Sequence, residues 1–99
     1  MKNIYRSSIL IIGFILLTAC TAMMPAQEMS DARQTLQAAK KVNADVIVPD
    51  AYKQAEALLE QATAELNQGD YTQARITALE ARKLANQARQ MAMTKKNIK

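Results

Sequence analysis

The feature that most constrains this chain is a stripe of alanines that begins directly after a glycine stop. Over residues 71–93 the stripe recurs at alternating intervals of three and four, which places it on one face of a helix. Its members are Tyr71, Ala74, Ala78, Ala81, Ala85, Ala88 and Ala92. Just upstream, Gly69 can end one helix and Asp70 can cap the next, with Gln73 three residues on, as in a capping box. Only a tight turn fits between them, so we expect the helices before and after it to pair antiparallel.

A second helix is expected over residues 49–67. Pro49 is favoured at the first position of a helix, where its missing N–H costs nothing. The seam of this helix has the same spacing as the alanine stripe and consists of Tyr52, Ala55, Leu59, Ala62 and Leu66. The two helices predict a long antiparallel, alanine-rich hairpin. The composition agrees, because two glycines, two prolines and 4% aromatic residues do not suit an all-β domain.

A shorter helix is expected before the hairpin, over residues 30–42. Ser30 can act as its N-cap, Asp31 suits its first turn, and Asn43 can end it in a left-handed conformation. Residues 46–48 are β-branched and are expected to form a short extended lid under the helix ends. The predicted fold class is therefore all-α and three-helix bundle-like, over residues 30–95. Alanine seams bury little area, so we expect the chain to associate with itself or with a partner.

The N-terminal residues are typical of an export signal. The first six residues carry two positive charges, Lys2 and Arg6, and an unbroken apolar run follows over residues 9–17. Nine helical residues span about 14 Å, far less than the roughly 30 Å hydrocarbon core of a bilayer. A basic start, a short apolar stretch and small residues after it predict a signal peptide over residues 1–19.

The residues Leu17-Thr18-Ala19-Cys20 resemble the lipobox of bacterial lipoproteins. The resemblance implies that the signal is cut before Cys20, that this cysteine is thioether-linked to diacylglycerol, and that residues 20–29 form a lipidated, flexible tether. Such an anchor is lasting when two or more acyl chains are attached. Thr21, which is not aspartate, implies the outer membrane with the domain facing the periplasm, or the outer face of the plasma membrane in a single-membrane bacterium. The alternative is an ordinary signal peptide in which Cys20 is incidental.

Charge is divided unevenly along the chain. Residues 28–70 hold eight acids and four bases, whereas residues 71–99 hold seven bases and one acid. One flank of the last helix carries a cation every seven residues, namely Arg75, Arg82, Arg89 and Lys96. In one interpretation this flank pairs with the acidic helix before the turn, with Glu56 facing Arg82. In the other, its surplus charge meets an acidic partner such as lipid headgroups, cell-wall carboxylates or another protein.

The opposite flank of the hairpin is apolar. Leu58 is expected to lie against Leu84 there, and the first helix is expected to cover this flank with Leu36. Ile76 and Leu79 face away from the predicted seam, and they are either the docking site of the first helix, which we take as the expectation, or an exposed contact for another molecule. The candidate partner-binding face therefore consists of Arg75, Arg82, Arg89, Ile76 and Leu79.

The residue types exclude several functions. The chain has no histidine and one cysteine, which rules out a zinc site, a Cys–His or Ser–His catalytic pair and an intrachain disulfide. No acids, lysines or hydroxyls stand at a spacing that marks acid–base catalysis, and alanine seams leave no substrate cavity. We therefore expect no enzyme, cofactor, metal or small-molecule substrate. Nucleic-acid binding is not expected either, because only Tyr52 and Tyr71 are available to stack on bases.

The residues around the turn are similar to those of a known bacterial family. The similarity covers roughly residues 30–93 and is carried by Leu58–Ala62, Glu65–Tyr71, Ala74-Arg75 and Ala81. The chain resembles a small helical domain of unknown function that occurs in short lipoproteins and beside OmpA-like peptidoglycan-binding domains. The resemblance implies no catalytic or ligand residues, and this chain contains no OmpA-like domain.

Two functions follow as expectations. The first is a lipid-anchored envelope protein that acts without catalysis, through a protein partner or self-association, with peptidoglycan as a further contact. The second is a tether like the major murein lipoprotein, joined to peptidoglycan through Lys99. Pro49 and the Gly69-Asp70 break argue against the second, because they interrupt the continuous coil that such a tether needs.

Overall fold

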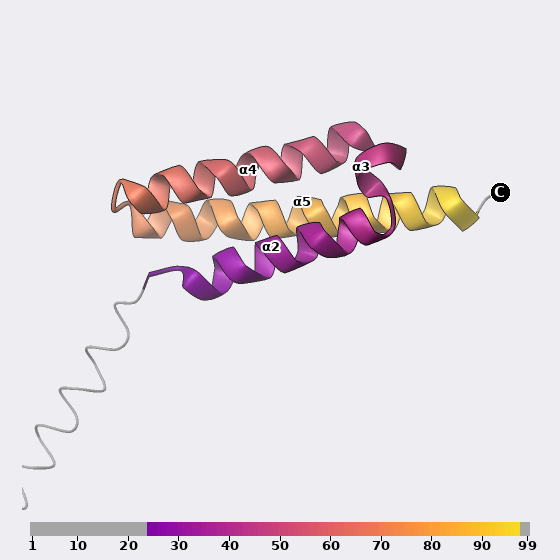
Figure 1. Cartoon of the computed structure of the whole chain (residues 1–99). Coiled ribbons are helices and arrows are strands. Elements are labelled where there is room, and N and C mark those ends of the chain that lie inside the picture. Colours follow the sequence, from indigo (N-terminus) through magenta and orange to yellow (C-terminus); the bar gives the residue numbers. More distant parts are fainter. Residues whose placement is uncertain (1–23, 98–99) are drawn as a thin grey trace, which may run out of the picture.

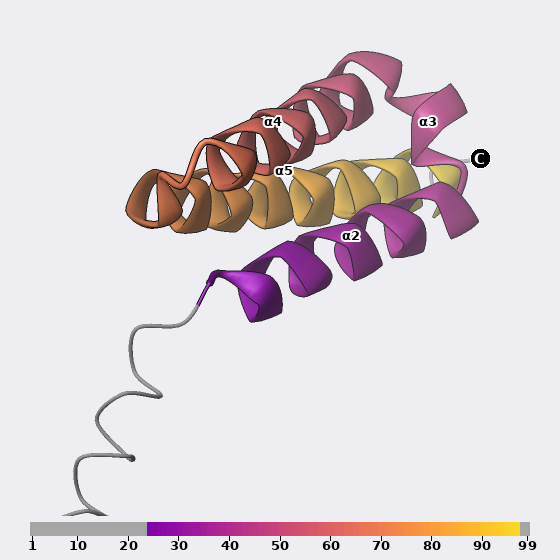
Figure 2. The same cartoon turned by 60° about the vertical axis from the view of Figure 1, so that its left-hand side comes forward.

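The computed structural model of the chain describes residues 24–97, and within that range every regular element is a helix (Figure 1). The elements are α2 (Ala26–Lys41), α3 (Ala44–Ile47), α4 (Pro49–Asn67) and α5 (Tyr71–Asn97). α4 and α5 run side by side in opposite directions, and α2 lies along α5 (Figures 1 and 2). The predicted fold class is confirmed: a shorter helix followed by a long antiparallel hairpin.

α5 is the central helix of the bundle. In both views it lies between α4 and α2, and α2 packs against α5 more extensively than against α4 (Figures 1 and 2). Met29 packs in one layer with Ala78, and Leu36 packs in the next layer with Ala85, so α2 runs parallel to α5. α2 therefore begins at the end of the bundle that holds the α4–α5 turn and ends at the opposite end.

The core consists of layers spaced by seven residues, which is two helical turns. The first two layers take buried residues from α2, α4 and α5, whereas the third takes them from α2, α3, Val48 and α5. The first contains Met29, Ala62 and Ala78, the second Leu36, Ala55 and Ala85, and the third Ala39, Ala44, Val48, Ala88 and Ala92. The residues that α5 contributes to these layers are alanines, so its neighbours approach closely and supply the larger side chains. The pairing of α4 with α5 has the register that the turn predicts.

The turn at residues 68–70 forms as expected from its sequence. Gly69 has a φ of 82°, the left-handed conformation in which glycine is favoured. The Asp70 carboxylate accepts a hydrogen bond from the Gln73 backbone N–H at 3.4 Å, so Asp70 caps α5. The capping box is not completed, because the Asp70 backbone N–H donates to the Glu65 carbonyl at 2.9 Å, while the Gln73 amide donates to the Thr77 hydroxyl at 3.4 Å.

The start of α2 differs from the prediction. The helix begins at Ala26, four residues before the expected start at Ser30, so residues 26–29 are helical and not part of a flexible tether. The Met29 N–H donates to the Pro25 carbonyl at 3.0 Å, and the Met29 side chain is 1% exposed in the first core layer. Ser30 lies inside the helix, where its hydroxyl accepts from the Gln34 amide at 3.5 Å. Burial of Met29 extends the helix by one turn.

The connector after α2 is helical where an extended lid was expected. Asn43 has a φ of 63°, which confirms the predicted left-handed stop. Its carbonyl then accepts the backbone N–H groups of Val46 and Ile47, which starts α3. Ala44 and Val48 pack under the end of α2 in the third core layer, as a lid would, whereas Val46 points outward. α5 continues to Asn97, four residues beyond its predicted end.

Candidate functional site

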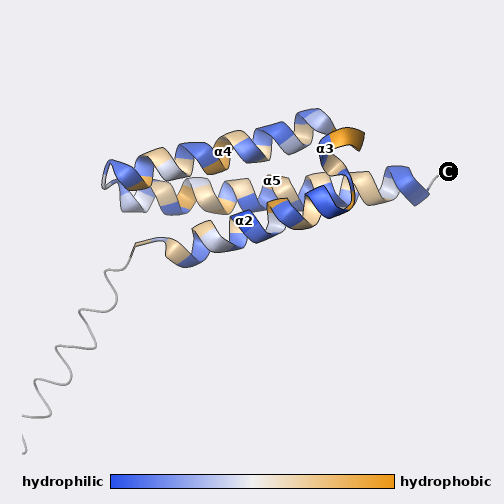
Figure 3. Cartoon of the chain, viewed as in Figure 1, coloured by the Kyte–Doolittle hydropathy of each residue, from blue (hydrophilic) through white to orange (hydrophobic). Residues whose placement is uncertain are grey.

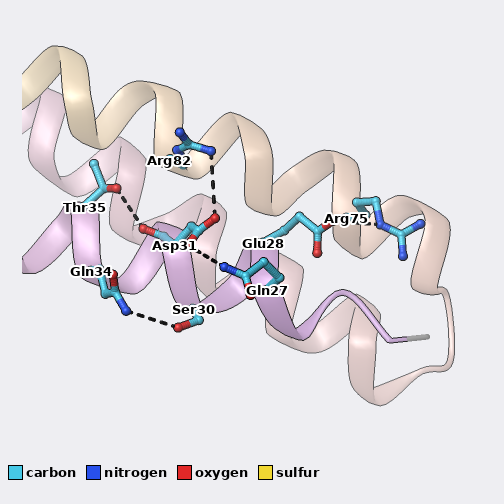
Figure 4. A network of polar contacts seen from close by, with 8 residues as sticks. All are labelled: Gln27, Glu28, Ser30, Asp31, Gln34, Thr35, Arg75 and Arg82. Atoms are coloured by element: carbon cyan, nitrogen blue, oxygen red, sulfur yellow. Dashed lines mark hydrogen bonds and ion pairs between the residues drawn. The ribbon is translucent and has the colours of Figure 1, made fainter. Parts of the chain in front are cut away.

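The arginine flank of α5 is the surface on which α2 lies. Arg75 Nε is 3.2 Å from Glu28 Oε1, and Arg82 Nη1 is 3.9 Å from Asp31 Oδ2 (Figure 4). Both acids lie in the first turns of α2, beside the buried Met29. The two ion pairs therefore align the beginning of α2 with the first half of α5.

This arrangement corrects two sequence predictions. The expected partner of Arg82 was Glu56 on α4, but the carboxylate beside Arg82 belongs to Asp31 on α2. The first helix was expected on the apolar flank, with Ile76 and Leu79 as its docking site, but it covers the arginine flank instead. The acids Glu28 and Asp31 lie next to the buried stripe of α2, and their counter-charges, Arg75 and Arg82, lie on this flank.

A polar groove follows the contact between α2 and α5. Its volume is about 320 Å³, and it is lined by Asp31, Gln34, Thr35, Ala38, Arg82, Asn86 and Arg89. The Thr35 hydroxyl is engaged, because it donates to the Asp31 carbonyl at 2.8 Å (Figure 4). Arg82 has one long ion pair and a side chain that is 54% exposed. Within residues 24–97, Arg89 has no ion pair, so the groove keeps surplus positive charge.

Ile76 and Leu79 lie on the outer face of α5, where they are 55% and 45% exposed. Leu79 lines a hollow of about 260 Å³ together with Arg82, Lys83 and Asn86. Arg82 and Asn86 also line the polar groove, so the two depressions adjoin the same side chains of α5. The structure thus brings Arg82, Arg89 and Leu79 onto one surface, with Ile76 one turn away. Arg75 belongs to the α2 docking contact.

A second groove, between α2 and α4, was not predicted. It has a volume of about 340 Å³ and contains both charged and apolar side chains: Arg33, Leu36, Gln37, Lys40, Tyr52, Glu56 and Leu59. Burial, and then the negative charges of Glu56 and Asp45, raise the pKa of Tyr52 above its ordinary value of 10.0. The sequence placed Tyr52 in the seam and Glu56 on the arginine flank, facing Arg82, but it did not place α2 beside them. The position of α2 was needed to see this groove.

The two grooves present groups that can contact another molecule. Over residues 24–97 there is no group of three or more acids or cysteines that could hold a metal ion. Both grooves are open along their length and lined by amides, guanidinium groups and alkyl chains. Such groups can hold carboxylates and alkyl side chains of another molecule. The predicted lipid-attachment residue, Cys20, lies outside the described residues, as does the signal over residues 1–19.

Comparison with known proteins identifies one family. The family described as Domain of unknown function (DUF4398) matches residues 27–99, which includes α2 and the whole hairpin. Comparison with curated proteins and comparison with solved structures each gave no match.

Proposed function

The chain belongs to the DUF4398 family of domains of unknown function, and we propose that it is a lipid-anchored cell-envelope protein that acts without catalysis by binding another protein. The single observation that carries this proposal is the surface formed by Arg82, Arg89, Ile76 and Leu79. It joins surplus guanidinium charge to exposed alkyl side chains on one helix. Arginine and exposed apolar residues are the types that protein interfaces favour.

The proposed anchor is a diacylglyceryl group on Cys20. Its support is the lipobox-like run Leu17–Cys20 after a short apolar segment. Among the helices of residues 24–97, none is both long and apolar enough to traverse a bilayer. We propose the periplasm-facing side of the outer membrane as the location, because Thr21 follows the cysteine. The chain enters α2 at the end of the bundle that holds the α4–α5 turn, so the partner surface begins close to the anchored end.

We narrow the proposed partner face by leaving out Arg75. Arg75 donates to Glu28 at 3.2 Å, and the pair connects two helices, which gives Arg75 a structural role. Arg82 and Arg89 line the open groove, where a partner carboxylate could be held by both nitrogens of one guanidinium group. The amides of Gln34 and Asn86 line the same groove and add further hydrogen-bonding groups.

The proposal can be tested with a photo-crosslinking side chain at Leu79 in the full-length, exported protein. We expect a discrete adduct with an envelope protein in the native membrane. Arg89→Gln should reduce the yield of that adduct several-fold, whereas Lys53→Gln, which removes an exposed charge from α4, should leave it unchanged. Equal adduct yields in the two variants would exclude the arginine groove as the partner site.

The tether resembling the murein lipoprotein is less well supported. The turn at residues 68–70 folds α5 back along α4, so the described chain is a hairpin and not one continuous helix. Lys99, the expected attachment residue, lies outside the described residues. Muropeptide analysis distinguishes the two functions, because only the tether leaves a peptide of this chain bound to the wall.

A further inference from the structure

The end of the bundle opposite the α4–α5 turn carries a second surface, which we name the basic end. It is formed where α2 ends, α3 turns and α5 continues past both. Four exposed lysines and two β-branched residues define it, namely Lys40, Lys41, Val46, Ile47, Lys95 and Lys96. Neither the predicted partner face nor the proposed protein-binding function uses these residues.

The basic end exposes apolar surface. Val46 is 74% exposed, the largest value among the exposed large hydrophobic residues of the described chain. In the hydropathy colouring, α3 forms the most hydrophobic stretch at this end of the bundle (Figure 3). Val46 and Ile47 line a hollow of about 480 Å³ whose other lining residues are Lys95 and Lys96. Lys95 also borders a neighbouring hollow of about 460 Å³, in which Met91 supplies an alkyl side chain. The same patch therefore presents alkyl groups and ammonium groups.

The positive charge at this end is not neutralised by ion pairs. Within residues 24–97, the ion pairs involve Arg75 and Arg82, and none includes a lysine of the basic end. The acids on the adjoining elements are Asp45 in α3, Asp50 in the first turn of α4, and Glu56, which lines the groove between α2 and α4 together with Lys40. The four lysines outnumber these three acids, and Lys95 and Lys96, which share a hollow with Val46, have no acid in its lining. By contrast, α2 begins with Glu28, and the turn at the opposite end carries Asp70.

We infer that the basic end binds the surface of an anionic phospholipid bilayer. A bilayer of this kind offers phosphate groups and an apolar interior within a few ångströms of each other, which matches lysines around an alkyl hollow. The lysine stems can lie along apolar surface while their ammonium groups reach the phosphates. An acidic glycan would neutralise the lysines but leave Val46 and the hollow in water, and lysine, unlike arginine, is depleted at protein interfaces. The lipid surface is therefore the partner that the residues favour.

The test uses the absence of tryptophan from this chain. Full-length protein carrying Val46→Trp has a single indole at the basic end, and full-length protein carrying Ile76→Trp has one on the outer face of α5. Both positions are exposed, and circular dichroism checks that each variant keeps its helicity. Each protein is mixed with vesicles of phosphatidylcholine alone, or of phosphatidylcholine with phosphatidylglycerol, that contain lipids brominated in their acyl chains. Bromine quenches an indole only when the indole reaches the acyl region.

We expect the anionic vesicles to quench more than about half of the fluorescence from position 46, and the neutral vesicles to quench little. The indole at position 76 should be quenched by neither. Lys95→Gln with Lys96→Gln should restore most of the fluorescence at position 46, whereas Lys53→Gln with Lys83→Gln, which removes the same charge elsewhere, should not. High salt should act like the first pair of substitutions.

Three results would overturn the inference. The first is that quenching at position 46 is no greater than quenching at position 76. The second is equal quenching by neutral and anionic vesicles. The third is a fluorescence change at position 46 that depends on protein concentration without vesicles, which would assign the basic end to a second copy of the chain. None of these results depends on the protein partner at Leu79, so this test and the crosslinking experiment fail separately.

Discussion

Arg75 and Glu28 are 47 residues apart in sequence, yet the guanidinium Nε of one lies 3.2 Å from a carboxylate oxygen of the other. This ion pair lies where α2 begins, beside the first core layer. A shift of α2 by one residue would rotate Glu28 away from α5 and Met29 out of the core. The pair therefore reports on both the alignment and the orientation of α2.

Replacing Glu28 by glutamine should weaken the docking of α2 without unfolding the hairpin. The side chains of Arg75 and Glu28 are 41% and 25% exposed, so solvent screens the ion pair. We therefore expect a loss of less than about 1 kcal/mol in the free energy of unfolding. Urea unfolding followed by circular dichroism measures this loss. Glu80→Gln, an exposed acid on α5, is the matched control and should change stability by less. If Glu80→Gln lowered the free energy of unfolding more than Glu28→Gln does, the ion pair would have no role in stability.

Replacing Met29 by alanine should be the more damaging change at the start of α2. Met29 is 1% exposed between α4 and α5, and removal of a buried methionine side chain typically destabilises by about 2–5 kcal/mol. A surface helix can relax into the space, so we expect the low end of this range. Met24→Ala, at an exposed position just before the helix, is the control. Similar thermal midpoints for the two variants would mean that Met29 is not part of the core.

Replacing Gly69 by alanine tests the turn between α4 and α5. A Cβ at this position would meet no atom within 4 Å, so the effect comes from the φ of 82° alone. We expect a loss of about 1–2 kcal/mol, because left-handed backbone is unfavourable for residues with a Cβ. Gly69→Asn should lose less, since asparagine tolerates this conformation. Chemical unfolding of the three proteins gives the order, and equal losses for alanine and asparagine would show that the strain lies elsewhere.

The raised pKa of Tyr52 predicts how stability changes in alkali. Burial, and then Glu56 and Asp45, disfavour the phenolate in the folded protein, so the folded state holds the phenolic proton more tightly than the unfolded state does. The contribution of Tyr52 is therefore complete below pH 10 and is lost as the pH rises through the folded pKa. Tyr52→Phe should flatten the fall in stability above pH 10. The difference in tyrosinate absorbance between the unaltered protein and Tyr52→Phe reports the titration of Tyr52, and a midpoint at or below pH 10.0 would contradict the prediction.

The hairpin could be predicted because its determinants are close together in sequence. Gly69 needs no partner to adopt its conformation, and Asp70 caps the helix that starts at the next residue. The alanine stripe after the turn then fixes which face of α5 is buried. All three signals are local, so they do not depend on the rest of the chain.

The docking of α2 could not be predicted from the sequence because its first turn was assigned to the tether. That assignment left Glu28 outside any helix, so the counter-charge of Arg75 was not visible. Asp31 was read as a residue that stabilises the helix end, although its side chain also faces Arg82 at 3.9 Å. Without these two acids, the apolar flank was the better candidate for the docking of α2. The wrong start predicted for α2 thus led to the wrong docking side for the whole helix.

The short helix α3 was missed for a different reason. Its residues Val46 and Ile47 favour extended structure by their branching, but Asn43 turns the chain so that its carbonyl accepts both of their N–H groups. This is a local backbone effect that outweighs the side-chain preference over so few residues. The basic end depends on it, because the turn is what leaves Val46 outside while Ala44 and Val48 are buried.

The seven-residue spacing of the core layers has a consequence for alignment. If α2 moved along α5 by seven residues, or about 10 Å, Met29 would take the place of Leu36 in the core. The buried neighbours are alanines at both positions. Because buried alanines recur every seven residues along α5, more than one alignment of α2 would pack against it. The short connection over residues 42–48 and the ion pairs of Glu28 and Asp31 together favour the observed alignment. Inserting a few residues into that connection would let α2 move along α5 to another of these alignments, and the length of the bundle would change.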